Sequence, residues 1–247
     1  MKIDASLTPE KLQKKIARLF SLAGDKINAI DRSWDSAQGT PVFTVKGKYT
    51  SRGWTEWTQG FQFGMAFLQY DATGDEHFLK LGREKTLKHM ASHVSHVGVH
   101  DHGFNNVSTY GNLRRLILEG RAAGSTDEVN YAELALKVSG AVQAARYATT
   151  NQTAPWSPVP GSAGVKPSGY VYSFNGPQSL FADTIRSMRA LVVAHQLGHV
   201  LMGEGDKPIN LLHRAIEHAA TTARYNVFFG QGRDSYDVRG RVAHESV

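Results

Sequence analysis

Two aspartates, Asp101 and Asp183, are the side chains from which we expect this sequence to do chemistry. Asp101 lies in the run Val-His-Asp-His-Gly-Phe at positions 99–104, so histidines flank it on both sides. This mixture is poor for a hydrophobic core, and it predicts a carboxylate that backbone donors hold at a cleft. The simpler alternative is an N-cap or loop acid for the helix that we expect to start near Val107.

Asp183 lies near the start of a helix that we expect over residues 179–201. A carboxylate in a first turn is favoured by the helix dipole, and this is the simpler interpretation. Three features favour a functional role instead. The preceding segment 168–177 is rich in Tyr, Ser, Phe, Asn and Gly, as carbohydrate sites often are. Arg186 follows one turn later, and serines at 179 and 187 share the face of Asp183.

The histidines raise the possibility of a metal site. His195 and His199 are one helical turn apart, as in zinc proteases, but Gln196 stands where the general base is expected. His195 also continues an apolar stripe, which predicts a role in the core or in helix packing. Another group lies within ten residues: His93, His96, His100 and His102. We expect no metal and no cofactor, and a histidine-based metallohydrolase remains the least favoured alternative.

Composition narrows the class of protein. The chain has 247 residues, 41% hydrophobic and 20% charged, which is ordinary for a globular domain. It has no cysteine, so disulfides and thiolate metal sites are excluded. The net charge is +6 with pI near 9.5. The basic residues are dispersed, so we expect an acidic small substrate rather than nucleic acid.

The sequence shows neither a membrane-spanning segment nor a signal peptide. No apolar run reaches the length of a membrane span, so we expect no membrane partner. The first fifteen residues are polar and charged, and no signal peptide is visible. The expected compartment is therefore cytoplasmic or periplasmic.

The elements that must position these residues are mainly helical. Thr8 and Pro9 open the first helix, and alternation at Phe43 and Val45 indicates a short strand or extended loop. A long irregular stretch covers 149–178, and an extended tail starts at Phe228. Further helices are expected at 58–72, from Asp75 to about 97, at 107–122, from about 126 to 147, at 179–201 and at 208–225. About seven helices in hairpins, with long loops on alternate connections, suggest an α/α toroid.

Three motifs resemble those of a known family, the unsaturated glucuronyl hydrolases of glycoside hydrolase family 88. The first is Trp57-Thr-Gln-Gly-Phe followed by the run at 70–75, and the second is the segment at 100–104 followed by Tyr-Gly-Asn at 110–112. The third is Asp183 placed before Met188. They occur in the family's order with comparable spacing. The resemblance implies an all-α (α/α)6 barrel that hydrates the C4=C5 double bond of an unsaturated uronic acid.

The same resemblance implies roles for single residues. Asp183 becomes the general acid/base, which needs a carboxyl of raised pKa, and Asp101 becomes the residue that positions the sugar and sets the charge on Asp183. Trp57, after which a helix should start, would stack on a sugar or simply cover the core. The full set of expected substrate-binding residues is Trp57, His100, Phe174, Asn175, Asp237 and His244. His102 is expected to orient the groups beside it.

Some positions depart from the family. Gln62 and Phe174 stand where tryptophans are expected, and Asp237 stands where a histidine is common. The similarity covers about the first three fifths of the family's length. We therefore expect residues 1–247 to form a single helical domain, an incomplete barrel with exposed apolar helix faces that could self-associate. The alternative function is a non-catalytic carbohydrate-binding remnant of such an enzyme.

Overall fold

The computed structural model describes residues 4–52, 57–150, 164–230 and 238–247. Helix α1 (Pro9–Ser33) begins as expected, because Thr8 accepts a hydrogen bond from the backbone N–H of Lys11 at 3.4 Å. A β-hairpin follows it, formed by β1 (Thr40–Val45) and β2 (Lys48–Arg52). The alternating residues of the predicted strand therefore do lie in a strand. Between α1 and β1 lies a short 3-10 helix at Ser36–Gln38.

The next two helices form a tight hairpin. Helix α2 (Thr58–Thr73) ends at Gly74, whose φ of 72° lets the chain turn, and α3 (Glu76–His89) begins at Asp75. The Asp75 carboxylate accepts from the N–H of His77 at 3.0 Å, which confirms the predicted cap. Phe67 of α2 and Leu79 of α3 are almost completely buried in the core between these helices.

The predicted helix from Asp75 to about residue 97 is wrong in its second half. Helix α3 stops at His89, and only a short turn, α4 (Ala91–Val94), follows. Tertiary polar contacts replace the helix there. The ring of His93 lies 2.6 Å from the side-chain oxygen of Gln59, and its carbonyl accepts from the Asn106 amide at 3.0 Å. These interior partners draw the chain out of the helical path.

The helix expected over 107–122 is also different in form. The chain makes α5 (His102–Asn105), a π-helical turn (Val107–Gly111) and then α6 (Asn112–Leu118). Helix α2 lies directly against the π-helical turn, since a Cβ atom on Gly64 would come within 2.5 Å of the Ser108 carbonyl oxygen. The wider turn thus fits a close helix crossing that a sequence period cannot reveal.

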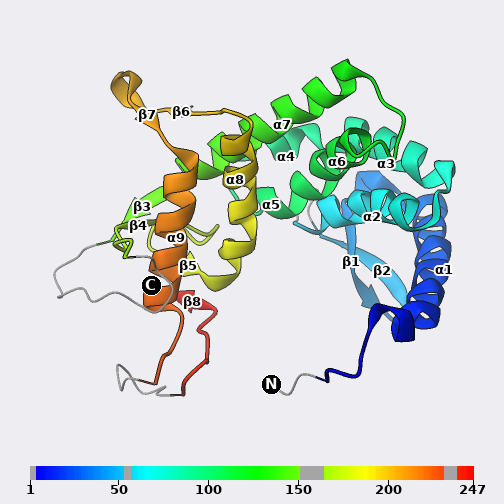
Figure 1. The fold of residues 1–247 in the computed structure, drawn as a ribbon, viewed down its shortest axis with the longest axis horizontal. Helices are drawn as coiled ribbons and strands as arrows, with labels where there is room; N and C mark the ends of the chain where they lie inside the picture. Colours follow the sequence, from blue (N-terminus) through cyan, green and yellow to red (C-terminus); the bar gives the residue numbers. More distant parts are fainter. Residues whose placement is uncertain (1–3, 53–56, 151–163, 231–237) are drawn as a thin grey trace.

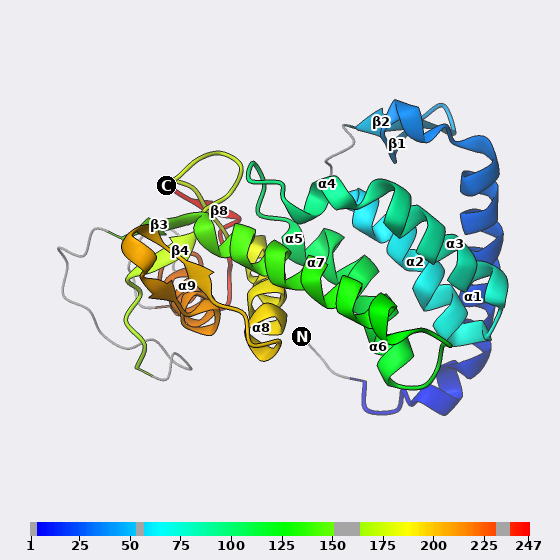
Figure 2. The ribbon, with the colours of Figure 1, turned by 90° about the horizontal axis from the view of Figure 1, so that it is seen from above.

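Helix α7 (Thr126–Ala145) joins the two sides of the molecule. Ser125 caps it by accepting from the N–H of Glu128 at 3.1 Å, as the capping-box pattern predicts. Figure 2 shows α7 crossing from α6 and α3 on one side to α8 (Met188–Gln196) and α9 (Leu211–Tyr225) on the other. Gly140 permits the contact with α8, because a Cβ there would lie 2.4 Å from the Ala194 Cβ.

The region expected to be one helix over 179–201 is three elements. A short strand β5 (Leu180–Phe181) leads into a 3-10 helix (Ala182–Ser187), and α8 follows. Strand β5 pairs with β8 (Glu245–Ser246) near the C-terminus, a long-range partner that local periodicity does not encode. Two other pairs are β3 (Tyr147–Thr149) with β4 (Gly169–Val171), and β6 (Leu201–Met202) with β7 (Pro208–Ile209).

The all-α class is confirmed, since the strands are short and paired only in twos. The described residues contain seven α-helices longer than one turn: α1, α2, α3, α6, α7, α8 and α9. Figure 1 shows them side by side as an open arc, with α1 at one end and α9 toward the other. None of the helices in the described residues is long and apolar enough to cross a membrane.

Candidate active site

Asp101 lies immediately before α5 and is 6% exposed. Its backbone carbonyl accepts from the N–H groups of Phe104 and Asn105 at 2.9 and 3.0 Å. Its side chain makes no capping hydrogen bond to α5, so the simpler interpretation as an N-cap does not describe it. The interior therefore fixes the backbone at Asp101.

Asp183 is in the first turn of the 3-10 helix Ala182–Ser187 rather than of a regular α-helix. This helix packs against α5 with almost no space between the backbones. A Cβ atom on Gly103 would lie 2.5 Å from Cα of Ser187. The glycine after Asp101 therefore lets two segments about 80 positions apart touch, and it brings the two aspartates to one place.

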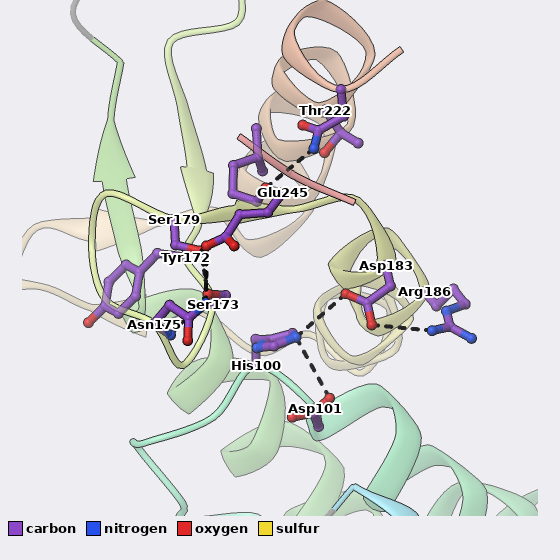
Figure 3. A network of polar contacts seen from close by, with 12 residues as sticks. His100, Asp101, Tyr172, Ser173, Asn175, Ser179, Asp183, Arg186, Thr222 and Glu245 are labelled. Carbon is purple, nitrogen blue, oxygen red and sulfur yellow. Dashed lines mark hydrogen bonds and ion pairs between the residues drawn. The ribbon is translucent and has the colours of Figure 1, made fainter. Parts of the chain in front are cut away.

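His100 lies between the two carboxylates (Figure 3). Its Nε2 atom is 3.8 Å from Oδ1 of Asp101 and 3.7 Å from Oδ1 of Asp183. The imidazole is 1% exposed, and the His100 carbonyl accepts from the Gln143 amide at 2.7 Å. One buried ring thus faces both acids, which couples the charge on one to the charge on the other.

Aromatic rings enclose His100. Phe174 stacks on it with ring centroids 5.6 Å apart and planes 21° apart, and Phe181 meets it edge-on at 5.4 Å. His244 lies against the other side of Phe181 at 4.6 Å. Phe174 is 57% exposed, so it covers the imidazole from the solvent side. The structure therefore brings Phe174 and His244 close to His100 and Asp183, and their expected role in substrate binding stays a prediction.

The loop that carries Phe174 is tied down by Glu245. Its Oε1 atom accepts from Ser179 Oγ at 2.5 Å and from the Asn175 amide at 3.1 Å. These two donors lower the pKa of Glu245, the serine most strongly. Asn175, an expected substrate-binding residue, thus already donates a side-chain hydrogen bond within the protein. The pair His244-Glu245 resembles a His-Gln pair of the family, but only His244 was among the expected substrate-binding residues.

Trp57 belongs to an aromatic wall formed with Phe61 and Phe104. The three ring centroids are 5.5 to 5.9 Å apart. Trp57 is 43% exposed at the start of α2, as the sequence suggested. The guanidinium of Arg186 lies over the Phe104 ring at 4.7 Å, and its Nη2 atom is 3.3 Å from Oδ2 of Asp183. Arg186 therefore contacts both this aromatic wall and Asp183. Asp237 lies outside the described residues.

The charge state of Asp183 differs from the expectation. The pKa of Asp183 is lowered, chiefly by the polar contact with His100 and also by electrostatic interactions with His100, Arg186 and His244. Burial acts in the opposite direction but is outweighed, because the side chain is still 29% exposed. The expected raised pKa is thus wrong for the free site. The carboxylate form is favoured there.

The remaining histidines are structural in this fold. His102 is buried, and its ring nitrogens lie 2.9 Å from Ser139 Oγ and 2.9 Å from the His96 carbonyl. Burial lowers the pKa of His102 to about 4, so the neutral ring is favoured. His195 is half-buried beside an open pocket with His199, rather than in the core. No group of three or more potential metal ligands occurs in the described part of the chain.

The chain was compared with protein families, with curated proteins and with solved structures. No protein-family model matches the chain, and no curated protein matches it. Solved structures do match. An unsaturated glucuronyl hydrolase from Streptococcus agalactiae superposes with a TM-score of 0.63 at 16% identity, covering 99% of this chain and 54% of its own. The chain has the fold of unsaturated glucuronyl hydrolases.

Two further matches agree. The unsaturated glucuronyl hydrolase specific for heparin gives a TM-score of 0.61 at 16% identity, with 89% of this chain and 49% of that chain covered. The enzyme from Bacillus sp. GL1, responsible for glycosaminoglycan degradation, gives 0.55 at 19% identity, with 94% and 54% covered. This chain therefore spans about half the length of the hydrolases that it matches.

Proposed function

We propose that this chain is a glycoside hydrolase that acts on oligosaccharides ending in an unsaturated uronic acid. One observation carries the proposal: His100 lies within 4 Å of both Asp101 and Asp183, in the fold of unsaturated glucuronyl hydrolases. The net charge of +6, which comes from dispersed basic residues, agrees with an acidic sugar as substrate. The substrate would come from a polysaccharide lyase, since lyases leave a C4=C5 double bond at the non-reducing end.

In the proposed reaction, Asp183 donates a proton to C4 while a water molecule adds to C5. The water loses a proton to the Asp183 carboxylate, so the acid is restored and one water has been added across the double bond. The resulting hemiketal opens, and the glycosidic bond breaks with release of the next sugar. Asp101 holds His100 in place between the two acids. Through His100 it influences the charge state of Asp183. Because no anomeric displacement occurs, carboxylate separation does not predict the stereochemistry.

The test is loss of the ultraviolet absorbance of the conjugated double bond when the protein meets a lyase-generated oligosaccharide. We expect Asp183→Asn to reduce turnover at least roughly a thousandfold, because an amide cannot exchange the proton. The matched control is Asp127→Asn, which removes an exposed acid from the first turn of α7. Full activity in Asp183→Asn, with its fold intact by circular dichroism, would remove Asp183 from this role.

A second candidate function is carbohydrate binding without turnover. The lowered pKa of Asp183 favours it, because the free site holds a carboxylate rather than the acid that the reaction needs. The same oligosaccharide distinguishes the two functions. Saturable binding by calorimetry, with no loss of absorbance over hours and over a range of pH, would establish binding alone.

A further inference from the structure

Arg186 is held more loosely than its neighbours at the site. Its contact with Asp183 joins one guanidinium nitrogen to one oxygen at 3.3 Å, whereas strong pairs lie at about 2.7–2.9 Å and use two bonds. Its side chain is 62% exposed. The face of the guanidinium rests on Phe104, so the other edge of the fork points away from the protein's own carboxylate. A second carboxylate could therefore be bound there.

Two other arginines nearby, Arg146 and Arg189, donate to groups of the protein itself. Arg146 donates to the carbonyls of Val97, Tyr172 and Ser173. Arg189 donates to the Gly103 carbonyl at 2.8 Å and to Ser108 Oγ at 3.2 Å. Arg146 is buried and Arg189 is exposed, but both use their guanidinium groups to hold the backbone of the site in place. Arg186 is the arginine of this group that is placed to meet a ligand.

We propose that Arg186 binds the carboxylate of an acidic sugar and that this binding releases Asp183 from its ion pair. The inference rests on the proposed function for the class of substrate. The apolar face of the sugar ring would lie toward the aromatic wall of Trp57, Phe61 and Phe104, which already supports the guanidinium. Arg186 thereby distinguishes acidic sugars from neutral ones.

This exchange also accounts for the protonation state that the reaction needs. The groups that face Asp183 are His100 from the segment before α5, Arg186 from its own helix and His244 from the C-terminal segment, with Asp101 beyond His100. A uronate bound to Arg186 brings one negative charge beside Asp183, which offsets the positive charge of Arg186. This change raises the pKa of Asp183, so the carboxyl becomes easier to protonate once substrate is bound.

Binding can be measured without turnover by using a saturated glucuronate-terminated disaccharide, which has no double bond to hydrate. Calorimetry on the full chain compares it with the matching glucose-terminated disaccharide. We expect a preference for glucuronate in the wild type that falls about tenfold in Arg186→Gln and partly in Arg186→Lys. Arg18→Gln, on the exposed face of α1, is the control for net charge. An unchanged preference in Arg186→Gln overturns the proposal.

The pH profile of turnover gives a second, independent readout. The profile of kcat/KM reports the free protein, and that of kcat reports the complex. We expect the alkaline limb of the kcat profile at a higher pH than the alkaline limb of the kcat/KM profile. This difference should disappear in Arg186→Gln, because Asp183 in the free variant has no guanidinium beside it. Coincident limbs in the wild type contradict the exchange. Arg186-dependent binding without any turnover would instead refute the proposed hydrolase while leaving the acidic-sugar site in place.

Discussion

The two aspartates sit in regions built by different means. Asp101 is fixed by the interior: it is 6% exposed and stands before α5, whose other residues are also buried. Asp183 stands on a 3-10 helix at the surface, and its side chain is 29% exposed. A short strand pair, β5 with β8, and the side chain of Glu245 hold that region in place.

Under the proposed function, this difference suits the two carboxylates to different tasks. A buried acid beside a buried imidazole cannot easily change its charge or its position, so it suits positioning. A half-exposed acid with a loose arginine partner can respond to a ligand and to pH. The contrast in exposure therefore supports Asp183 as the group that exchanges protons, with Asp101 as the fixed reference.

Gly103→Ala should produce the largest effect, because it separates the two regions. The new Cβ would lie 2.5 Å from Cα and 2.9 Å from the carbonyl oxygen of Ser187, and backbone atoms cannot rotate away. We expect the free energy of unfolding to fall by about 3 kcal/mol. Turnover should fall further than the folded fraction does, since the distances from His100 to the acids must grow. Urea denaturation and the absorbance assay measure the two losses.

The control for this change is Gly74→Ala at the end of α2. Gly74 has a φ of 72°, and a Cβ added there would have no other atom within 4 Å, so only backbone strain is added. That strain should cost about 1 kcal/mol and leave turnover of the folded fraction unchanged. Equal stability losses at Gly103 and Gly74 would show that the close contact between the two regions is not needed.

The pH dependence of the free energy of unfolding should show whether His102, next to Asp101, is shielded from water. Burial lowers the pKa of His102 to about 4 from its usual 6.5. Between these values the unfolded chain binds a proton that the folded chain does not, so stability is lost as pH falls through this window. We expect His102 to account for about 2 kcal/mol of loss between its usual pKa and roughly pH 5.

Urea denaturation at a series of pH values, for the wild type and for His102→Gln, measures this contribution. The variant should be less stable at neutral pH but should show the shallower fall on acidification. His213→Gln is the control, since its side chain is 68% exposed and faces Glu217 on α9. Parallel wild-type and His102→Gln profiles would mean that His102 is hydrated in solution.

Local signals in the sequence predicted much of this structure. The caps at Thr8, Asp75 and Ser125 each form the hydrogen bond that their residue types predict. The two aspartates, Phe174 and His244 lie together, although the form of the elements that carry them was not predicted. These successes depend on contacts within one turn, or on a motif that carries long-range information.

Most of the failures share one physical cause, which is a distant partner. The expected helix over 179–201 loses its first turns because Leu180 and Phe181 find a strand partner about 65 residues away. The raised pKa expected for Asp183 failed because burial alone was considered, whereas His100 and Arg186 supply the larger effect. Spacing along the chain contains neither the strand partner nor the approach of His100 to Asp183. Arg186 is visible one turn after Asp183, but its effect on the pKa was left out of the expectation.

Glu245→Ala should give the smallest and most local effect, because it loosens one region and spares the other. Without the carboxylate, Ser179 and Asn175 lose their shared acceptor, and the loop under Phe174 opens more often. Hydrogen exchange should become several-fold faster at the amide of Ala182, which donates to the His244 carbonyl at 2.8 Å. The amide of Phe104, bonded to the Asp101 carbonyl, should keep its rate, and Glu245→Gln should restore most of the protection. Faster exchange at both amides would mean that the two regions open as one unit, and the division between a fixed and a responsive acid would then fail.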